Sequence, residues 1–291
     1  MKLIGATPAG SYRHEQGLHG VRVGVIDTGI DGTHPDIKPN FDKHLSRNFT
    51  HDAPVIDGPC QDDIDGSCKP DPANVVENGH GTHVAGTIGA ARNGLGMAGV
   101  APNVDLVNLR AGQDSGYFFI LPTVDALTYA ANHGIDVVNM SYDIDPWLFD
   151  CARNPADSPA EQRGQQIIRG AANRALNYAH RHGVTLIAAE GNESTDLGHP
   201  TVDDSSPDHP NPDTSPHHRV IDDSCVSEPS ENPHVINVSS IGPGLRKAFY
   251  SNYGTERTDV AAPGGDSRTY YGTARYTRPR APRCSRPSRR A

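Results

Sequence analysis

Three short segments of the chain contain polar side chains whose type and spacing are suited to chemistry. Asp27 ends the apolar run Val-Arg-Val-Gly-Val-Ile, His80 and His83 lie in Asn-Gly-His-Gly-Thr-His-Val-Ala-Gly, and Asn192 follows Leu-Ile-Ala-Ala-Glu-Gly. Taken singly, each has an ordinary structural explanation, because Asp and Asn cap strand-ending turns and a histidine before a helix is often a surface residue. Histidines at i and i+3 are able to share a metal ion, but no matching acidic ligand motif follows this pair.

Short runs rich in Val and Ile predict the strands that must position these segments. The runs cover residues 21–26, 104–109, 135–140, 184–189 and 234–239. Helices are predicted between them at 81–91, at 121–133, and from Ser158-Pro159 to a stop at Gly183. This alternation favours an α/β fold with a mostly parallel central sheet and helices on both faces, whose sites form at the carboxyl ends of the strands. Residues 50–78 and 194–233 are predicted to be polar surface insertions.

Composition and charge restrict the classes of function. The 291 residues include 30 Gly and 24 Pro and are 35% hydrophobic, which is typical of a loop-rich globular chain. The net charge of −9 makes nucleic acid a poor partner. No apolar run reaches the roughly 18 residues that a membrane span needs, and the first residues contain no signal-peptide core. We expect a monomer with no nucleic-acid or membrane partner.

The last 18 residues break sharply with this composition. Residues 274–291 contain seven Arg, three Pro and no acidic residue, so they have nothing with which to build a packed element. A basic tail for nucleic acid is one interpretation, and a translated wrong reading frame, which we prefer, is the other. We therefore expect a folded domain at 1–273 and a disordered tail at 274–291.

Cysteine usage follows the same division. Four cysteines lie in residues 1–273 and the fifth, Cys284, lies in the tail. An even number favours disulfides and an oxidising, extracellular setting. Cys60 and Cys68 enclose a short loop and form the obvious local pair, which leaves Cys151 for Cys225, although sequence alone permits three connectivities.

Taken together and in this order, the three segments resemble the subtilisin-like serine proteases, or subtilases, whose triad runs Asp, His, Ser along the chain. The most specific match is His-Gly-Thr-His-Val-Ala-Gly-Thr, and Gly99–Pro102, Asn139–Ser141, Ser251–Gly254 and Asp259–Gly264 extend the resemblance. It covers about residues 2–265. It implies a three-layer subtilisin-like fold and a secreted serine endopeptidase that cleaves peptides or proteins without a required cofactor.

The resemblance also implies roles for individual residues. Asp27 would orient and stabilise the imidazole of His80, which would act as general base and then as general acid. Asn192 would donate its amide to the developing oxyanion, and His83 would be a buried structural residue.

The same resemblance implies two walls for the primary specificity pocket. One wall would be Ser141, Tyr142 and Asp143, and the other Ala189, Glu190 and Gly191. Many relatives have Gly where this chain has Asp143, so the preference of the pocket stays open.

The serine of the family lies in Gly-Thr-Ser-x-Ala-x-Pro at the start of a long apolar helix, and this motif is absent here. Ser267 lies in a turn-like Gly-Gly-Asp-Ser-Arg, and Ser285 and Ser288 lie in the tail. We therefore expect the C-terminal part of the catalytic domain to be missing and the chain to be inactive as it stands. A pseudo-protease or fragment that only binds peptides is the alternative, and a metal hydrolase using His80 and His83 is a third hypothesis.

Calcium is common in the family. Asp36 and Asn93 match ligand positions of one family site, although its N-terminal ligand has no counterpart here. The acidic loop between Cys60 and Cys68 could hold calcium too, but a solvated loop is the simpler interpretation.

Overall fold

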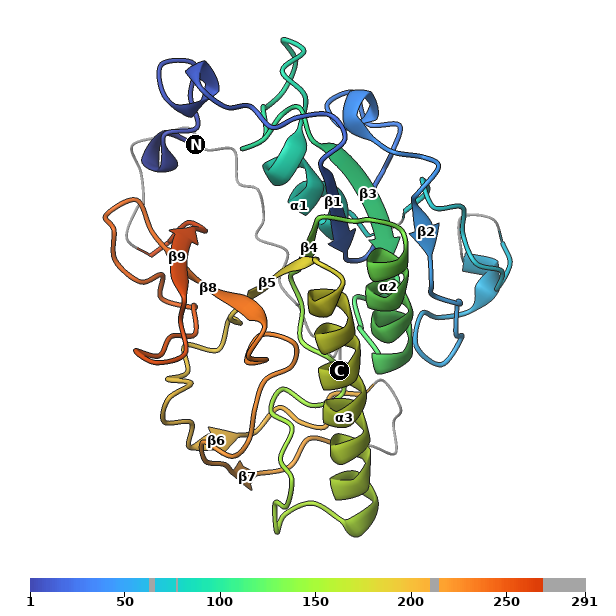
Figure 1. The fold of residues 1–291 in the computed structure, drawn as a ribbon. Coiled ribbons are helices and arrows are strands. Elements are labelled where there is room, and N and C mark those ends of the chain that lie inside the picture. Colours follow the sequence, from blue (N-terminus) through green and yellow to red (C-terminus); the bar gives the residue numbers. More distant parts are fainter. Residues whose placement is uncertain (63–65, 77, 210–214, 269–291) are drawn as a thin grey trace.

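Seven parallel strands form the central sheet of the protein in a computed structural model, which describes residues 1–62, 66–76, 78–209 and 215–268. The strand order is β2-β3-β1-β4-β5-β8-β9, and β6 and β7 form a separate antiparallel pair (Figure 1). The five predicted strands are confirmed as β1, β3, β4, β5 and β8, and β2 and β9 lengthen the sheet at its two edges. The bounds are β1 Arg22–Ile26, β2 Arg47–Asn48, β3 Asp105–Arg110, β4 Val137–Met140, β5 Thr185–Ala189, β6 Val202–Asp203, β7 Arg219–Val220, β8 Val235–Ile241 and β9 Val260–Pro263.

Three α-helices accompany the sheet in the described part of the chain, close to where the sequence predicts them. The longest begins with a capping box, in which Ser158 Oγ accepts the Glu161 N–H and the Glu161 carboxylate accepts the Ser158 N–H, and Pro159 occupies its first turn. The helices are α1 His80–Gly89, α2 Ile120–Asn132 and α3 Pro159–Arg181, with short 3₁₀ helices at Lys2–Ile4, Ser11–Arg13, Lys38–Asn40 and Cys60–Asp62.

The helices lie on both faces of the sheet, as predicted. The helices α2 and α3 pack together on one face, and α1 lies on the other, over β1 and β3 (Figure 1). Alternation along the strands divides the core accordingly: Ile26 and Met140 face α2 and α3, whereas Val25 packs on the side of α1 with Ala85. This arrangement is a three-layer α/β fold.

The face of the sheet on which α1 lies is only partly covered. No helix in the described ranges packs over β5, β8 and β9 on this side. Ile187 pairs with Ile236 and Val238 with Val260, so apolar side chains line up across the strands. Ile236 is 38% exposed and Val260 is 49% exposed. This row of apolar side chains is the kind of surface that a further helix would cover.

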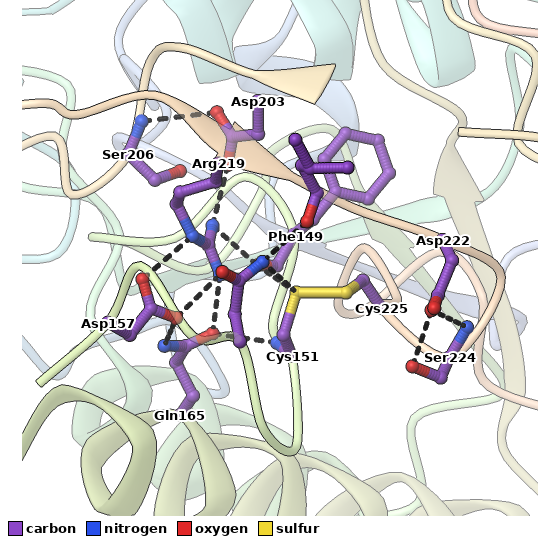
Figure 2. The surroundings of a disulfide bond; sticks show 12 residues. Phe149, Cys151, Asp157, Gln165, Asp203, Ser206, Arg219, Asp222, Ser224 and Cys225 are labelled. Atoms are coloured by element: carbon purple, nitrogen blue, oxygen red, sulfur yellow. Dashed lines mark hydrogen bonds and ion pairs between the residues drawn. A yellow bond between two sulfur atoms is a disulfide. The ribbon is translucent and has the colours of Figure 1, made fainter. Parts of the chain in front are cut away.

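The two predicted disulfides are both present. Cys60 pairs with Cys68 and Cys151 with Cys225, with Cα atoms 5.1 Å and 4.2 Å apart. The first closes a short loop, and the second joins the segment before α3 to the segment that precedes β8 (Figure 2). Cys284 and the predicted boundary at residue 273 lie outside the described residues.

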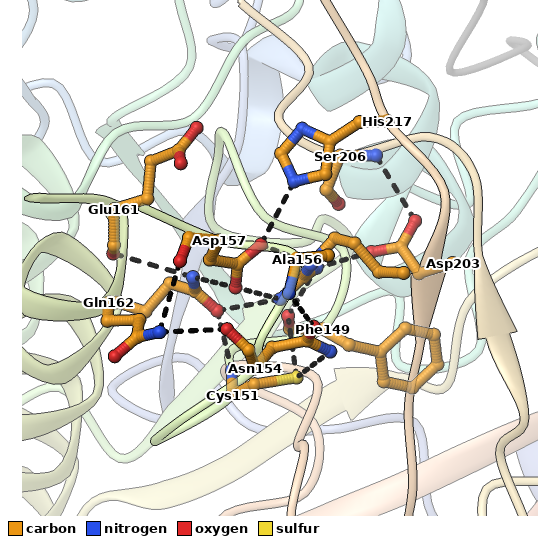
Figure 3. Close-up of polar contacts among 12 residues, drawn as sticks. Phe149, Cys151, Asn154, Ala156, Asp157, Glu161, Gln162, Asp203, Ser206 and His217 are labelled. Carbon is orange, nitrogen blue, oxygen red and sulfur yellow. Dashed lines mark hydrogen bonds and ion pairs between the residues drawn. The ribbon is translucent and has the colours of Figure 1, made fainter. Parts of the chain in front are cut away.

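The predicted polar insertion at 194–233 is not simply a surface loop. Arg219 in β7 is fully buried and donates to Asp157, to Asp203, to Gln165 and to the carbonyl of Phe149, over distances of 2.7–3.2 Å (Figure 2). Figure 3 shows the ring of His217 against Asp157 as well, with His217 Nε2 3.0 Å from Asp157 Oδ1. The guanidinium of Arg219 also lies 4.7 Å from the centre of the Trp147 ring. A buried charge is tolerated when it is paired and fully hydrogen-bonded, so this polar segment is fixed to α3 through its arginine.

Candidate active site

Asp27 and His80 form a direct side-chain contact at the carboxyl edge of the sheet. Asp27 follows β1 and is fully buried, and His80 is the first residue of α1. The distance from His80 Nδ1 to Asp27 Oδ1 is 2.7 Å. The close approach depends on Gly81, because a Cβ there would lie 2.3 Å from the carbonyl oxygen of Gly29 and 3.0 Å from the Cβ of Asp27. The expected meeting of these two side chains is therefore observed.

Neighbouring groups fix both members of the pair. The Thr28 N–H donates to Asp27 Oδ1 at 2.7 Å, and Thr28 Oγ1 accepts the Gly81 N–H and donates to the carbonyl of Asn78. The His80 N–H donates to Asn78 Oδ1 at 3.1 Å. An ionised carboxylate only accepts hydrogen bonds, so His80 Nδ1 carries the proton that it donates to Asp27. Nε2 is therefore left as the basic nitrogen of the ring.

The environment of His80 acts on its pKa in opposing directions. Burial lowers the pKa, while the hydrogen bond that His80 donates to Asp27 and the negative charge of that carboxylate raise it, and the net result is a pKa above the ordinary 6.5. The contribution of the charged pair to stability is therefore complete below pH 6.5, and it is lost as the pH rises through the raised pKa.

Replacing Asp27→Asn is expected to lower the pKa of His80 to below 6.5, because burial remains while the charge is removed. An NMR titration of the imidazole resonances measures it. The exposed pair His19–Asp105, at 2.9 Å, provides the control, and Asp105→Asn should leave the titration of His80 unchanged. An unaltered midpoint in the Asp27→Asn variant would show that the charge of Asp27 does not act on His80.

Asn192 lies at the same edge of the sheet. Strands β1 and β5 are parallel and are separated by β4, and Asn192 follows β5 just as Asp27 follows β1. Its side chain is exposed, and no described residue bonds to its amide, while its N–H donates to Glu193 Oε2 at 2.8 Å. The amide is thus available to an incoming acceptor.

The turn that presents Asn192 is built around a residue whose role the sequence did not reveal. Asn252 is 1% exposed and bonds to both sides of the turn. Its Oδ1 accepts the N–H groups of Glu193 and Thr195, and its Nδ2 donates to the carbonyl of Glu190. Gly191 is required beside it, with φ +105°, because a Cβ there would lie 2.3 Å from Asn252 Nδ2. The only signal in the sequence is the motif Ser-Asn-Tyr-Gly.

The predicted pocket residues differ in their orientation. The segments 141–143 and 189–191 leave β4 and β5 side by side, since Met140 pairs with Ala188. Ser141 Oγ accepts a hydrogen bond from Asn139, and Asp143 Oδ1 accepts one from Ser227 at 3.0 Å. Two side chains point away from solvent: Tyr142 stacks on Phe118 with ring centres 4.0 Å apart, and Glu190 bonds to Thr258, while Ala189 is exposed.

Asp36 and Asn93 come together in one group of loops. Asp36 Oδ2 accepts the Met97 N–H at 3.1 Å, and its Oδ1 is buried without a partner in the described part of the chain. Asn93 Nδ2 donates to the carbonyl of Pro35 at 3.0 Å. A buried, unpartnered carboxylate oxygen fits a cation ligand. The described residues contain no group of three or more His, Cys, Asp or Glu placed to hold a metal ion.

The prediction that His83 is buried is wrong. His83 is exposed on α1, and Thr87, one turn further on, is exposed as well. The reason is the incomplete cover of this face, because no described residue packs over this side of the helix.

A cavity of about 350 Å³ lies elsewhere, between α2 and α3, and none of the candidate residues lines it.

Comparison with known proteins agrees with the fold. Residues 19–285 match the model of the Subtilase family, Peptidase S8. The thermophilic serine proteinase of Bacillus sp. strain AK1 is 31% identical over 252 residues, which are 86% of this chain and 45% of that protein. Subtilisin DY of Bacillus licheniformis is 28% identical over 264 residues, 90% of this chain and 72% of that protein.

Two solved structures share the fold. The nisin leader peptidase NisP from Lactococcus lactis has a TM-score of 0.70 at 24% identity, over 94% of this chain and 70% of that one. The epidermin leader peptide processing serine protease EpiP from Staphylococcus aureus has a TM-score of 0.66 at 24% identity, over 89% of this chain and 55% of that one.

The match over residues 19–285 and the three-layer α/β fold place the chain among the subtilisin-like peptidases. The chain belongs to the subtilase family. Among the described residues, no helix is long and apolar enough to cross a membrane.

Proposed function

We propose that this chain carries the Asp and the His of a serine endopeptidase catalytic domain, without its serine, and a peptide-binding cleft at the carboxyl edge of the sheet. The observation that carries the proposal is the bond from His80 Nδ1 to Asp27 Oδ1, which leaves Nε2 free to move a proton. Asp27 holds the imidazole in this tautomer and stabilises the imidazolium. His80 Nε2 takes the proton of an attacking hydroxyl and then gives it to the leaving amine.

Asn192 supplies the second part of the machinery. In the proposed mechanism its exposed amide donates to the oxygen of the scissile carbonyl as that oxygen becomes negative. A donor of this kind contributes about 2.7–4 kcal/mol in the transition state, as the equivalent asparagine does in subtilisin. Asn252 acts through the backbone, since it holds the turn that carries Asn192.

The nucleophile is the missing part of this proposal. Residues 1–291 contain no Gly-Thr-Ser-x-Ala-x-Pro, Ser267 lies in a turn after β9, and Ser285 and Ser288 lie outside the described residues. Residues 1–291 by themselves therefore bind peptides without turning them over at the rate of a subtilase. This is the peptide-binding module of the alternative hypothesis.

The setting of the protein follows from the same features. The two disulfides agree with secretion into an oxidising environment. In this proposal the protein is a monomer, and its ligand is a peptide or a protein. The catalysis needs no cofactor. A calcium ion held by Asp36 and Asn93 would fix the loop 93–97 against the segment that contains Asp36, through oxygen ligands.

Peptide binding tests the proposal directly. A fluorescent Ala-Ala-Pro-Leu amide is titrated with the 291-residue chain, and fluorescence anisotropy measures binding. We expect saturable binding of the L-peptide and none of its all-D enantiomer, because a backbone-binding cleft is chiral. Equal signals from both enantiomers would contradict a specific cleft.

A further inference from the structure

We infer that His180 and His234 form a binding site for a divalent transition-metal ion, such as Zn²⁺ or Cu²⁺, at the amino edge of the central sheet. The two imidazole rings lie with their centres 4.3 Å apart and their planes within 6° of parallel. His180 lies in the last turn of α3, and His234 directly precedes β8. The site is separate from Asp27 and Asn192, which lie at the opposite, carboxyl edge of the sheet.

Two neighbouring strands bring these histidines together. After His180, α3 ends and the chain turns into β5, whose Leu186 pairs in parallel with Val235 of β8. Both histidines therefore lie where the chain is about to enter one of two adjacent strands. The backbone of His234 is held as well, because its N–H donates to Asn232 Oδ1 at 3.2 Å. The proximity of the two rings thus rests on backbone positions that the sheet fixes.

Both rings are available to an incoming ion. His180 and His234 are exposed, and within the described ranges their rings contact each other but form no hydrogen bond or ion pair. The histidines at two other positions of this edge differ, since His133 and His182 each donate Nδ1–H to the carbonyl four residues earlier, at 2.8 Å. His180 and His234 therefore keep all their ring nitrogens for other ligands.

The rings have to turn before they share an ion. A metal lies in the plane of the imidazole that binds it, at about 2.0–2.1 Å from the nitrogen for zinc, so two stacked rings cannot hold one ion without moving. The turn takes place about the bond from Cβ to the ring, a torsion that is soft in histidine. Because the side chains of His180 and His234 are exposed and make no other polar contact in the described part of the chain, nothing opposes it.

The surroundings select the class of ion. Imidazole nitrogens suit zinc, copper and nickel, whereas calcium and magnesium prefer oxygen ligands. The carboxyl end of α3 adds a partial negative charge from its free carbonyl groups, which favours a cation near His180. No third His, Cys, Asp or Glu of the described residues joins the pair, so water completes the coordination and binding is weaker than at a four-ligand structural zinc site.

A bound ion would connect α3 to β8 and thereby stabilise the fold. The folded chain presents both rings together, so binding adds to stability in proportion to the logarithm of the free metal concentration once the site is saturated. Only unprotonated imidazoles bind a metal, so protons compete with the ion. The stability of the chain should therefore depend on zinc at pH 7.5 and should lose this dependence at pH 5.

Isothermal titration calorimetry with ZnCl₂ at pH 7.5 tests the inference, in a His80→Ala background that removes any contribution of the Asp27–His80 pair. We expect His180→Ala and His234→Ala each to weaken binding at least tenfold, which corresponds to about 1.4 kcal/mol. The double variant should bind no more weakly than either single variant, because loss of one ring already ends the shared coordination.

A matched control uses the other histidine at the end of α3. His182→Ala removes an exposed imidazole two residues from His180 and should retain the zinc affinity. Circular dichroism verifies that all variants are folded, which their exposed positions favour.

Two results would overturn the inference and leave the proposed peptide cleft untouched. One is an equal zinc affinity in the parent chain and in the double variant, which would place the ion elsewhere. The other is a pair of losses in the single variants that add up in the double variant, which would mean that the two rings bind separate ions.

Discussion

Residues 1–291 are expected to hydrolyse a general peptide substrate about 10⁶-fold more slowly than a subtilisin with its complete triad. His80 has the geometry of a general base, but no serine in the required context is present for it to deprotonate. In subtilisin itself, loss of the serine alone lowers turnover by about this factor. The oxyanion hole and the substrate-binding contacts then still accelerate the reaction by roughly 10³–10⁴-fold over the uncatalysed reaction in water. A chromogenic tetrapeptide anilide with long incubation measures the residual rate.

The variant His80→Ala provides the internal control for this expectation. If His80 deprotonates no hydroxyl in this chain, its replacement should change the small residual rate by less than about threefold. The reason is that the members of a triad act as a unit, so that loss of a second member adds little once the first is missing. A residual rate that falls by orders of magnitude in His80→Ala would mean that a nucleophile is already in place.

The second large effect concerns stability. Arg219→Met is expected to cost about 3–5 kcal/mol, because it leaves the carboxylates of Asp157 and Asp203 buried without their cation. This is a large part of the roughly 5–15 kcal/mol by which a domain is stable. Urea unfolding followed by circular dichroism measures the loss.

Two further variants make this prediction specific. Arg174→Met removes an exposed arginine from α3 and should change stability by less than about 0.5 kcal/mol. Adding Asp157→Asn and Asp203→Asn to Arg219→Met should recover part of the loss, since the uncompensated charges are then gone. A cost below about 1 kcal/mol for Arg219→Met would show that the buried network does not hold residues 194–233 in place.

The sequence predicted the main elements because their signals are local. The strands β1, β3, β4, β5 and β8 are runs of Val and Ile, and α3 carries its cap, its proline and its stop in the sequence. The two-residue strand Arg47–Asn48 gives no such signal, since it is defined only by its pairing with β3. The polar composition of 194–233 was misleading because Arg219 is buried by its partners and not by apolar character.

The sequence predicted those site residues that lie in a distinctive local motif. Asp27 and His80 each lie in a distinctive segment. They meet because Asp27 follows the carboxyl end of β1 and His80 begins α1, which packs on that strand. Asn252 was missed because a single Asn in a turn motif does not reveal that it bonds to a loop about 60 residues earlier. The orientation of Tyr142 toward Phe118 and the exposure of His83 likewise depend on which elements pack nearby.

In the proposed mechanism Asp27 and His80 form a prepared base, and no serine in the described part of the chain is hydrogen-bonded to His80 Nε2. Labelling with a fluorophosphonate probe tests this arrangement most directly, with the labelled residues identified by mass spectrometry. We expect the same weak background in the 291-residue chain and in His80→Ala, with no serine modified stoichiometrically. A stoichiometric adduct on Ser267, Ser285 or Ser288 that disappears in His80→Ala would contradict it.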